Sequence, residues 1–309
     1  MLDTWIRGGT IIDGTGAPRF EADLGIRDGV IVAVGSTGEP GGREINARGL
    51  LVTPGWVDVH THYDGQVDWD PYLTPSLWHG VTTVVMGNCG VGFAPVSPGK
   101  QDWLISLMEG VEDIPGTALS EGVSFEWESF PQYMDKISKK PHAIDIVAQV
   151  PHGALRTYVM GERGADHSEK PTRDEIETMG RFARLAIAEG AVGFSSSRTK
   201  NHRTRDGEFT PSLTAGADEL LGIAEAIGEG GRGVFQMVSD FADLEKEFAL
   251  LRKMVEVSGR PMSISVAQND RVPTQWRRLL DLIDDAVKDG LPMMGQVPPR
   301  AVGLLLGLQ

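Results

Sequence analysis

The chain has 309 residues, with 29 Lys and Arg against 43 Asp and Glu, so its formal net charge is −14. Such an acidic chain is a poor ligand for polyanions, which argues against a nucleic-acid partner. Charged residues make up 23% of the chain and apolar residues 40%, which is the usage of a folded globular protein and excludes disorder for the bulk of the chain.

The sequence shows no feature of a secreted or membrane protein. Its single cysteine, Cys89, cannot form a disulfide within the chain. The first twenty residues contain no apolar signal core, and the longest strongly apolar stretch, Ala301–Leu308, is too short to cross a bilayer. We therefore expect a cytoplasmic protein without a membrane partner, of a size that allows one large domain with one small one.

The first predicted domain, residues 1–52, consists of short strands. Asp28-Gly29 separates two apolar runs and is a strong hairpin signal. The predicted strands are 5–12, 22–27, 30–34 and 43–52. Three or four short strands form a thin sheet that needs a partner to bury one face.

From Thr53 onward, short apolar runs alternate with helical patterns, which indicates a parallel sheet, either open or closed into a barrel. Seven strands are predicted, at 55–60, 81–87, 144–150, 191–195, 234–238, 262–267 and 291–297. The clearest helices are 173–189, beginning after Thr172, then 217–228 and 244–258. The stretch 88–143 is too long for a simple connection and predicts a lid-like insertion.

The second predicted domain, residues 53–309, has too few strands for a closed (β/α) barrel, which needs eight. The fold class is α/β, with about seven strands in this domain, and the strand pattern alone fits an open doubly wound sheet as well as an incomplete barrel. Residues 301–309 are apolar, without a polar tail, which favours a chain cut inside a domain over a buried terminal element. We accordingly expect residues 1–309, expressed alone, to be poorly soluble and inactive.

Most of the functional information lies in residues 54–62, Pro-Gly-Trp-Val-Asp-Val-His-Thr-His. His60 and His62 are two residues apart, so on a strand they share one face and can bind one metal ion together. They should emerge at the carboxyl end of a buried strand, where barrel enzymes place their catalytic residues. Asp58 shares that face and is a candidate to hydrogen-bond a ligand histidine. An isolated His-x-His is more often a pair of surface histidines. The preceding Pro-Gly-x-x-Asp sequence and the predicted strand favour a metal site here.

This segment resembles the first barrel strand of the amidohydrolase superfamily. Residues 8–14 and 26–35 are similar to that superfamily's N-terminal strands, and residues 80–90 narrow the resemblance to its D-aminoacylase (N-acyl-D-amino-acid deacylase) branch. The resemblance implies an α/β barrel flanked by a small β-sandwich built from both chain ends. Residues 53–309 would then be an incomplete TIM-like (β/α) barrel of about seven strands, and residues 1–52 an N-terminal β-sandwich segment. The resemblance also implies a proton-transferring Asp on an eighth strand, which would lie beyond Gln309.

Cys89 is the third metal ligand that the resemblance implies. It ends the second predicted strand, near the point where His60 and His62 emerge, and both thiolate and imidazole suit Zn²⁺. The alternatives are a buried, inert cysteine and a Cys–His nucleophile pair. We expect one ion of Zn²⁺ or another divalent metal.

Two positions depart from the D-aminoacylase pattern, which places a metal-binding histidine on each of the fifth and sixth strands. Here the fifth strand offers Gln236 and the sixth offers Val266. Neither is a normal zinc ligand, so the sequence predicts a divergent subfamily without a tightly held second metal.

Four residues are candidates to bind the substrate. His152 follows the third strand, where it can face the barrel mouth. Arg198, His202 and Arg203 are predicted in the loop that follows the fourth strand, and guanidinium groups there could clamp a substrate carboxylate bidentately. The alternatives are a structural histidine at 152 and a solvated basic loop.

Together these features predict a metal-dependent amidohydrolase that cleaves a non-peptide C–N bond in a small amide, such as an N-acyl-D-amino acid. The metal would polarise the amide carbonyl, and a carboxylate would carry the proton to the departing nitrogen. One alternative is an inactive fragment that acts only as a binding module. Another is a ring-opening cyclic-amide hydrolase, which uses a carbamylated lysine on the fourth strand, whereas residues 191–195 contain no lysine.

Overall fold

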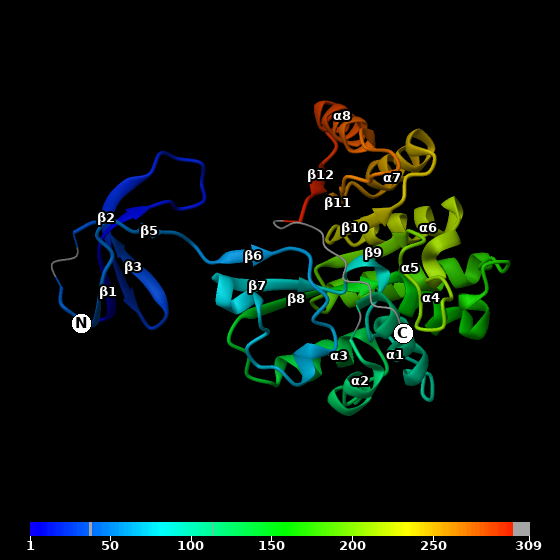
Figure 1. The fold of residues 1–309 in the computed structure, drawn as a ribbon, viewed down its shortest axis with the longest axis horizontal. Coiled ribbons are helices and arrows are strands. Elements are labelled where there is room, and N and C mark those ends of the chain that lie inside the picture. The colour runs from blue at the N-terminus through cyan, green and yellow to red at the C-terminus, as the bar shows by residue number, and fades with distance from the viewer. Residues whose placement is uncertain (37–38, 113, 299–309) are drawn as a thin grey trace. The chain divides into compact units, whose positions relative to one another are not determined.

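The computed structural model describes residues 1–36, 39–112 and 114–298, so the apolar stretch predicted at 301–309 lies outside the described residues. The chain divides into two compact units, Met1–Trp56 and Val57–Gln309. Figure 1 shows the elements of both units along the chain. In the described ranges, no helix is long and apolar enough to cross a membrane.

The first unit contains one mixed β-sheet, with strand order β3-β2-β1-β4 and β5 also paired to β1. Its strands are β1 (Leu2–Ile11), β2 (Phe20–Arg27), β3 (Val30–Val34), β4 (Gly41–Asn46) and β5 (Leu51–Val52). β1, β2 and β3 pair antiparallel, while β4 and β5 run parallel to β1. Asp28 and Gly29 both have positive φ, at 52° and 75°, as a tight hairpin turn requires. The predicted hairpin between β2 and β3 is therefore present.

The second unit contains a seven-stranded sheet in the order β12-β11-β10-β9-β8-β7-β6. Its strands are β6 (Trp56–Asp58), β7 (Val81–Met86), β8 (Asp145–Pro151), β9 (Gly193–Arg198), β10 (Val234–Ser239), β11 (Met262–Ser265) and β12 (Met293–Gln296). The pairings from β7 to β12 are parallel. The incomplete α/β barrel that the sequence predicted is thus confirmed, with its seven strands in chain order.

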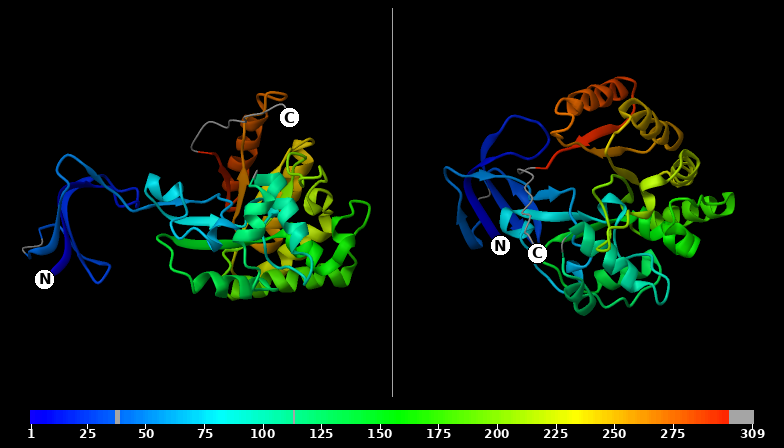
Figure 2. Two further views of the ribbon diagram at one scale, coloured as in Figure 1. Left: turned by 60° about the horizontal axis from the view of Figure 1, so that its bottom comes forward. Right: turned by 45° about the vertical axis from the view of Figure 1, so that its right-hand side comes forward.

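Helices connect these strands and lie on the outer side of the curved sheet (Figure 2). The α-helices are α1 (Gln101–Glu112), α2 (Gly116–Gly122), α3 (Phe130–Ser138), α4 (His152–Met160), α5 (Arg173–Ala188), α6 (Ala217–Glu229), α7 (Leu244–Ser258) and α8 (Gln275–Lys288). Short 3₁₀ helices are η1 (Gln66–Asp68), η2 (Ser76–His79), η3 (Asn88–Gly90), η4 (Gly161–Ala165) and η5 (Pro211–Thr214). Phe194, Phe235 and Ile264 of the strands are fully buried in the core cluster that the helices complete.

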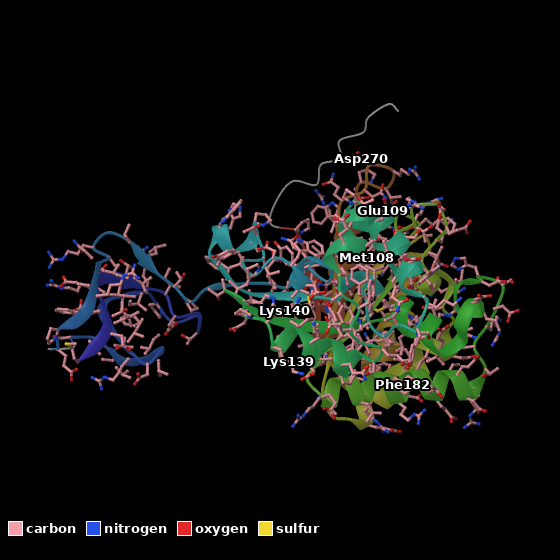
Figure 3. The ribbon with its side chains drawn as sticks, turned by 90° about the horizontal axis from the view of Figure 1, so that it is seen from below. Met108, Glu109, Lys139, Lys140, Phe182 and Asp270 are labelled. Atoms are coloured by element: carbon pink, nitrogen blue, oxygen red, sulfur yellow. The ribbon has the colours of Figure 1, made fainter. Side chains whose placement is uncertain are left out.

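The segment 88–143 is more firmly packed than the predicted lid-like insertion. It contains α1, α2 and α3, and its Leu107 and Met108 are fully buried in the same core cluster as the strands. Figure 3 labels Met108 on α1. The apolar side chains of this segment explain the difference, because exposing them in a mobile lid would forgo about 1.5–3 kcal/mol for each large one.

The helix α5 begins at a capping box. The Thr172 hydroxyl accepts a hydrogen bond from the Glu175 amide at 3.3 Å, and the Thr172 amide donates to Glu175 Oε2 at 2.7 Å. These contacts satisfy two backbone donors of the region where the helix starts. The start that the sequence predicted after Thr172 is therefore correct.

Replacing Thr172 by Ala should lower the free energy of unfolding by about 1 kcal/mol, because the first turn of α5 loses its hydroxyl acceptor. Chemical denaturation of the full chain measures the change. Thr172→Ser keeps a hydroxyl and should retain most of the stability. An alanine variant as stable as the parent would contradict the assignment.

Candidate metal centre

A tight turn at the end of β7 presents Cys89. Cys89 itself has φ of 56°, in the left-handed region, and it is flanked by Gly87 with φ of 74° and Gly90 with φ of 69°. A Cβ atom at Gly87 would lie 2.2 Å from the Gln149 carbonyl oxygen, so only glycine fits there. The turn therefore brings the cysteine to the carboxyl end of the strand.

Neighbouring strands hold this turn through buried hydrogen bonds. The Cys89 amide donates to Gln236 Oε1 at 2.7 Å, and Gln236 Nε2 donates to Ser265 Oγ at 3.1 Å. The Gly90 amide donates to Ser195 Oγ at 2.9 Å. Gln236, which stands where a histidine ligand was expected, thus supports the cysteine backbone.

His60, His62 and Cys89 converge at the same end of the sheet. One ligand atom from each lies within 4.8 Å of the other two. His60 Nε2 lies 3.2 Å from Cys89 Sγ, and the two imidazole rings have centroids 5.3 Å apart. Two imidazole nitrogens and one sulfur form a donor set that fits Zn²⁺. The structure therefore brings the three predicted ligands together, and metal binding itself stays a prediction.

The position of His60 depends on the curvature of the sheet. Its Nδ1 lies 3.0 Å from Oε1 of Gln296, the last residue of β12. His60 follows β6, and β6 and β12 are the two edge strands. In a flat seven-stranded sheet these edges would be about 29 Å apart, so this contact requires the strongly curved arrangement of a barrel.

Burial keeps these histidines neutral. Burial lowers the pKa of His60, although the hydrogen bond to Gln296 partly opposes this effect. Burial, with the nearby His60 and His202, lowers the pKa of His62 well below its ordinary value. Neutral imidazoles have a lone pair available, as metal ligands must.

Burial raises the pKa of the Cys89 thiol well above its ordinary value, and the carboxylates of Glu112 and Asp64 add to this effect. Reactive cysteines instead have a lowered pKa, in electropositive surroundings. The surroundings of Cys89 therefore disfavour a Cys–His nucleophile. A metal ligand and an inert thiol remain as alternatives.

Asp58 contacts the backbone of a candidate ligand and not its ring. Asp58 Oδ1 accepts a hydrogen bond from the His60 amide at 3.3 Å, and Oδ2 accepts one from Ser76 Oγ at 3.3 Å. The sequence suggested a bond to a ligand imidazole, but Gln296 occupies Nδ1 of His60. Asp58 thus fixes the chain just before the two histidines.

Among the predicted substrate-binding residues, His202 is coupled by charge to the candidate ligands, since it lowers the pKa of His62. Its Nδ1 is 3.0 Å from Ser197 Oγ. Burial lowers the pKa of His202 to about 4, with a further contribution from His60. His202 is therefore a neutral, polar side chain beside the centre, and its role in substrate binding stays a prediction.

The other three predicted substrate-binding residues have protein partners. Both ring nitrogens of fully buried His152 are bonded, to Ser196 Oγ at 2.8 Å and Glu219 Oε1 at 3.1 Å. Arg198 pairs with both oxygens of Glu247 at 2.7 and 3.0 Å. Arg203 donates to two carbonyl groups of its own loop and stacks over Phe209. Arg198 ends β9 with its side chain only 16% exposed, so it does not lie in the solvated loop that the sequence suggested. Substrate binding by these three residues stays a prediction.

Sequence reasoning missed two side chains at the centre. Gln296 is the last residue of β12 and lies one residue before the end of the predicted strand 291–297, so its position near a strand end was a usable signal. Glu112, the last residue of α1, has an oxygen 3.3 Å from His62 Nδ1. No sequence pattern links a helix end in the insertion to the first strand, because that contact exists only in the folded chain.

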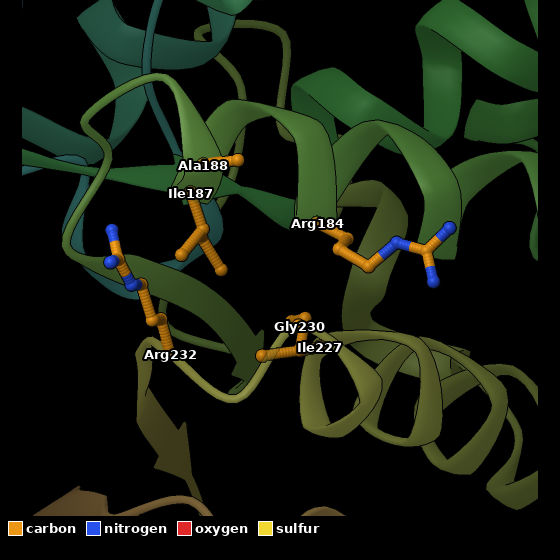
Figure 4. A pocket seen from close by; sticks show the side chains of 6 residues that line it. All are labelled: Arg184, Ile187, Ala188, Ile227, Gly230 and Arg232. Carbon is orange, nitrogen blue, oxygen red and sulfur yellow. The ribbon is translucent and has the colours of Figure 1, made fainter.

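A separate surface pocket lies between the C-terminal turns of α5 and α6 (Figure 4). Its lining residues are Arg184, Ile187, Ala188, Ile227, Gly230 and Arg232. These turns lead into the N-terminal ends of β9 and β10, whereas the candidate ligands lie at the carboxyl ends of strands. The pocket is therefore at the opposite end of the sheet from the chemistry.

The fold and these side chains define a partial (β/α) barrel with candidate metal ligands at the carboxyl ends of its strands. The model of the amidohydrolase family matches residues 43–303, and the chain belongs to this family. This match covers all of the candidate ligands.

Individual members of this family with known names are similar to the chain. D-aminoacylase from Alcaligenes xylosoxydans xylosoxydans is 31% identical over 231 residues, covering 74% of this chain and 43% of the relative. A solved structure of D-aminoacylase, studied for its binuclear metal centre, has 28% identity and a TM-score of 0.79. N-acyl-D-glutamate deacylase from Bordetella bronchiseptica, solved with zinc and a phosphonate mimic of the tetrahedral intermediate, has 30% identity and a TM-score of 0.78.

Each of these two solved structures covers 97% of this chain, while the chain covers 59% of each solved relative. The chain therefore spans well under two thirds of the length of the proteins that it resembles.

His202 should make stability depend on pH. Its pKa is about 4 in the folded chain and 6.5 ordinarily, so between these values the unfolded chain binds more protons. Its contribution is present above pH 6.5 and is lost as pH falls toward 4. In the metal-free chain, His202→Asn should reduce this loss in urea titrations across that range.

Burial raises the pKa of Asp64 to about 7, so its contribution to the free energy of unfolding changes with pH in the opposite direction. Asp64 is present in both proteins, so the difference between the parent chain and His202→Asn reports on His202. His79→Asn, at an exposed histidine, serves as the control. Identical pH profiles for the parent chain and His202→Asn would refute the prediction.

Proposed function

We propose that this protein is a metal-dependent hydrolase that deacylates an N-acyl-D-amino acid or a similar small amide. The observation that carries the proposal is the cluster of His60, His62 and Cys89, whose ligand atoms lie within 4.8 Å of one another at the carboxyl ends of the strands. Membership of the amidohydrolase family supports hydrolysis of a C–N bond. The D-aminoacylase and N-acyl-D-glutamate deacylase relatives support the substrate class.

In this proposal His60, His62 and Cys89 hold one divalent ion, with Zn²⁺ favoured by the nitrogen and sulfur donors. When bound, such an ion acts as a Lewis acid on the amide carbonyl and lowers the pKa of water toward ~7. Gln296 holds the His60 ring through its Nδ1, and Gln236 holds the Cys89 backbone through its amide.

His202 supplies a neutral hydrogen-bonding group beside the two histidines. A neutral imidazole can donate a hydrogen bond to a substrate oxygen, and because it carries no charge it does not repel a bound metal ion. We assign proton transfer to no residue within the described ranges. The expected carboxylate on an eighth strand stays a prediction from the family resemblance.

The double variant His60→Ala, His62→Ala should bind no zinc, because two of the three ligands are removed. Elemental analysis after dialysis should give about one equivalent for the parent and none for the variant. Hydrolysis of N-acetyl-D-amino acids, measured in a version of the protein extended past Gln309, should be lost with the metal. His79→Ala, at an exposed histidine, serves as the control.

Equal metal in parent and double variant would refute the site. Zinc binding by the extended protein without hydrolysis of any N-acyl amino acid would instead favour a protein that acts as a binding module.

A second metal should not be held tightly. Gln236 uses both ends of its side-chain amide within the protein, and Val266 is apolar and buried. Dialysis of the zinc-loaded parent against a mild chelator should leave about one equivalent. Retention of two equivalents would contradict this prediction, as would a structure with an ion in contact with Gln236.

A further inference from the structure

We propose that Glu112 is a positioning residue that accepts a hydrogen bond from His62 Nδ1 and so directs Nε2 of His62 to the metal. This inference rests on the proposed metal site and adds to it a residue from outside the strands. It assigns a function to the end of α1, in the segment 88–143 that was expected to form a lid.

The first observation is the burial of the His62 ring nitrogen. His62 Nδ1 is buried, and the structure gives it no hydrogen bond of standard geometry. Glu112 Oε1 lies 3.3 Å from it, and the two side chains are only 16% and 21% exposed. A buried polar atom without a partner is costly, so the carboxylate beside it is the acceptor that the structure offers.

The second observation is the matching arrangement at His60. His60 Nδ1 lies 3.0 Å from Gln296 Oε1, and an amide oxygen can only accept, so this nitrogen carries the proton. His60 Nε2 is then the nitrogen with the lone pair, and it lies 3.2 Å from Cys89 Sγ. Glu112 would impose the same tautomer on His62, leaving both histidines with a free Nε2.

The third observation indicates that Glu112 positions His62 and is not itself a metal ligand. The ligand atoms within 4.8 Å of one another come from His60, His62 and Cys89, and Glu112 is not among them. A carboxylate that contacts the other nitrogen of a ligand histidine orients the ring and raises its basicity. Glu112 fits that role better than the role of a fourth ligand.

The helix that carries Glu112 is firmly held. Leu104, Leu107 and Met108 of α1 are buried in the core, so the end of this helix has a defined position. Glu109, labelled in Figure 3, lies three residues earlier on the same helix. Its carboxylate contacts Arg205 at 3.3 Å, not a histidine, and it is therefore a matched control.

The first test measures zinc affinity of the full chain by competition with a chromogenic chelator. Glu112→Ala should weaken binding by roughly 10- to 100-fold. Glu112→Gln keeps an acceptor oxygen and should recover part of this loss. Glu109→Ala should leave the affinity unchanged. Unchanged affinity in Glu112→Ala, in a parent that does bind zinc, would overturn the inference while the proposed function stands.

The second test does not depend on zinc. Nitrogen-15 NMR of the metal-free chain reports which ring nitrogen of His62 carries the proton. The parent should show the Nδ1–H form, and Glu112→Ala should shift His62 toward a mixture of tautomers while His60 stays unchanged. If the parent binds no zinc, the proposed function fails, and this spectrum still decides the role of Glu112. An unaltered His62 tautomer in Glu112→Ala would refute it.

Discussion

The hydrogen bond between His60 and Gln296 joins the two edges of a seven-stranded sheet, and the candidate centre depends on the curvature that makes it possible. The contact between the Cys89 amide and Gln236 has the same origin, since β7 and β10 are three strands apart. Parallel strands place their carboxyl ends on one rim, and curvature brings the side chains of that rim into contact. Groups from distant parts of the chain thereby share one small volume.

That shared volume has an electrostatic consequence. His60, His62 and His202 lie close enough for their charges to repel, and burial lowers the pKa of all three. The centre is therefore a set of neutral nitrogen donors at pH 7, next to a thiol whose pKa burial raises. This arrangement lowers the stability of the fold in acid, where the histidines must become protonated. It is suited to a metal cation, because the neutral imidazoles have free lone pairs and the cation favours the thiolate form of Cys89.

The segment 88–143 contributes both to the hydrophobic core and to the candidate metal centre. Its apolar residues complete the core, and its first helix ends at Glu112 beside His62. A carboxylate held in this way makes the environments of His60 and His62 unequal, because His60 contacts an amide oxygen and His62 a carboxylate. In the proposed enzyme, such a difference allows each ligand to be tuned by its own partner.

The sequence alone determined the elements with regular periodicity, including the barrel strands and the start of α5 at Thr172. It also brought His60 and His62 to one rim, because both follow directly after the first barrel strand. The strand alternation expected for them does not apply, since β6 ends at Asp58. Only the tertiary structure decided the partners of each polar group. Asp58 bonds a backbone amide, Arg198 pairs with Glu247, and Glu112 contacts His62. Such contacts join residues far apart in the chain or depend on the direction of one side chain, and local periodicity carries no information about either.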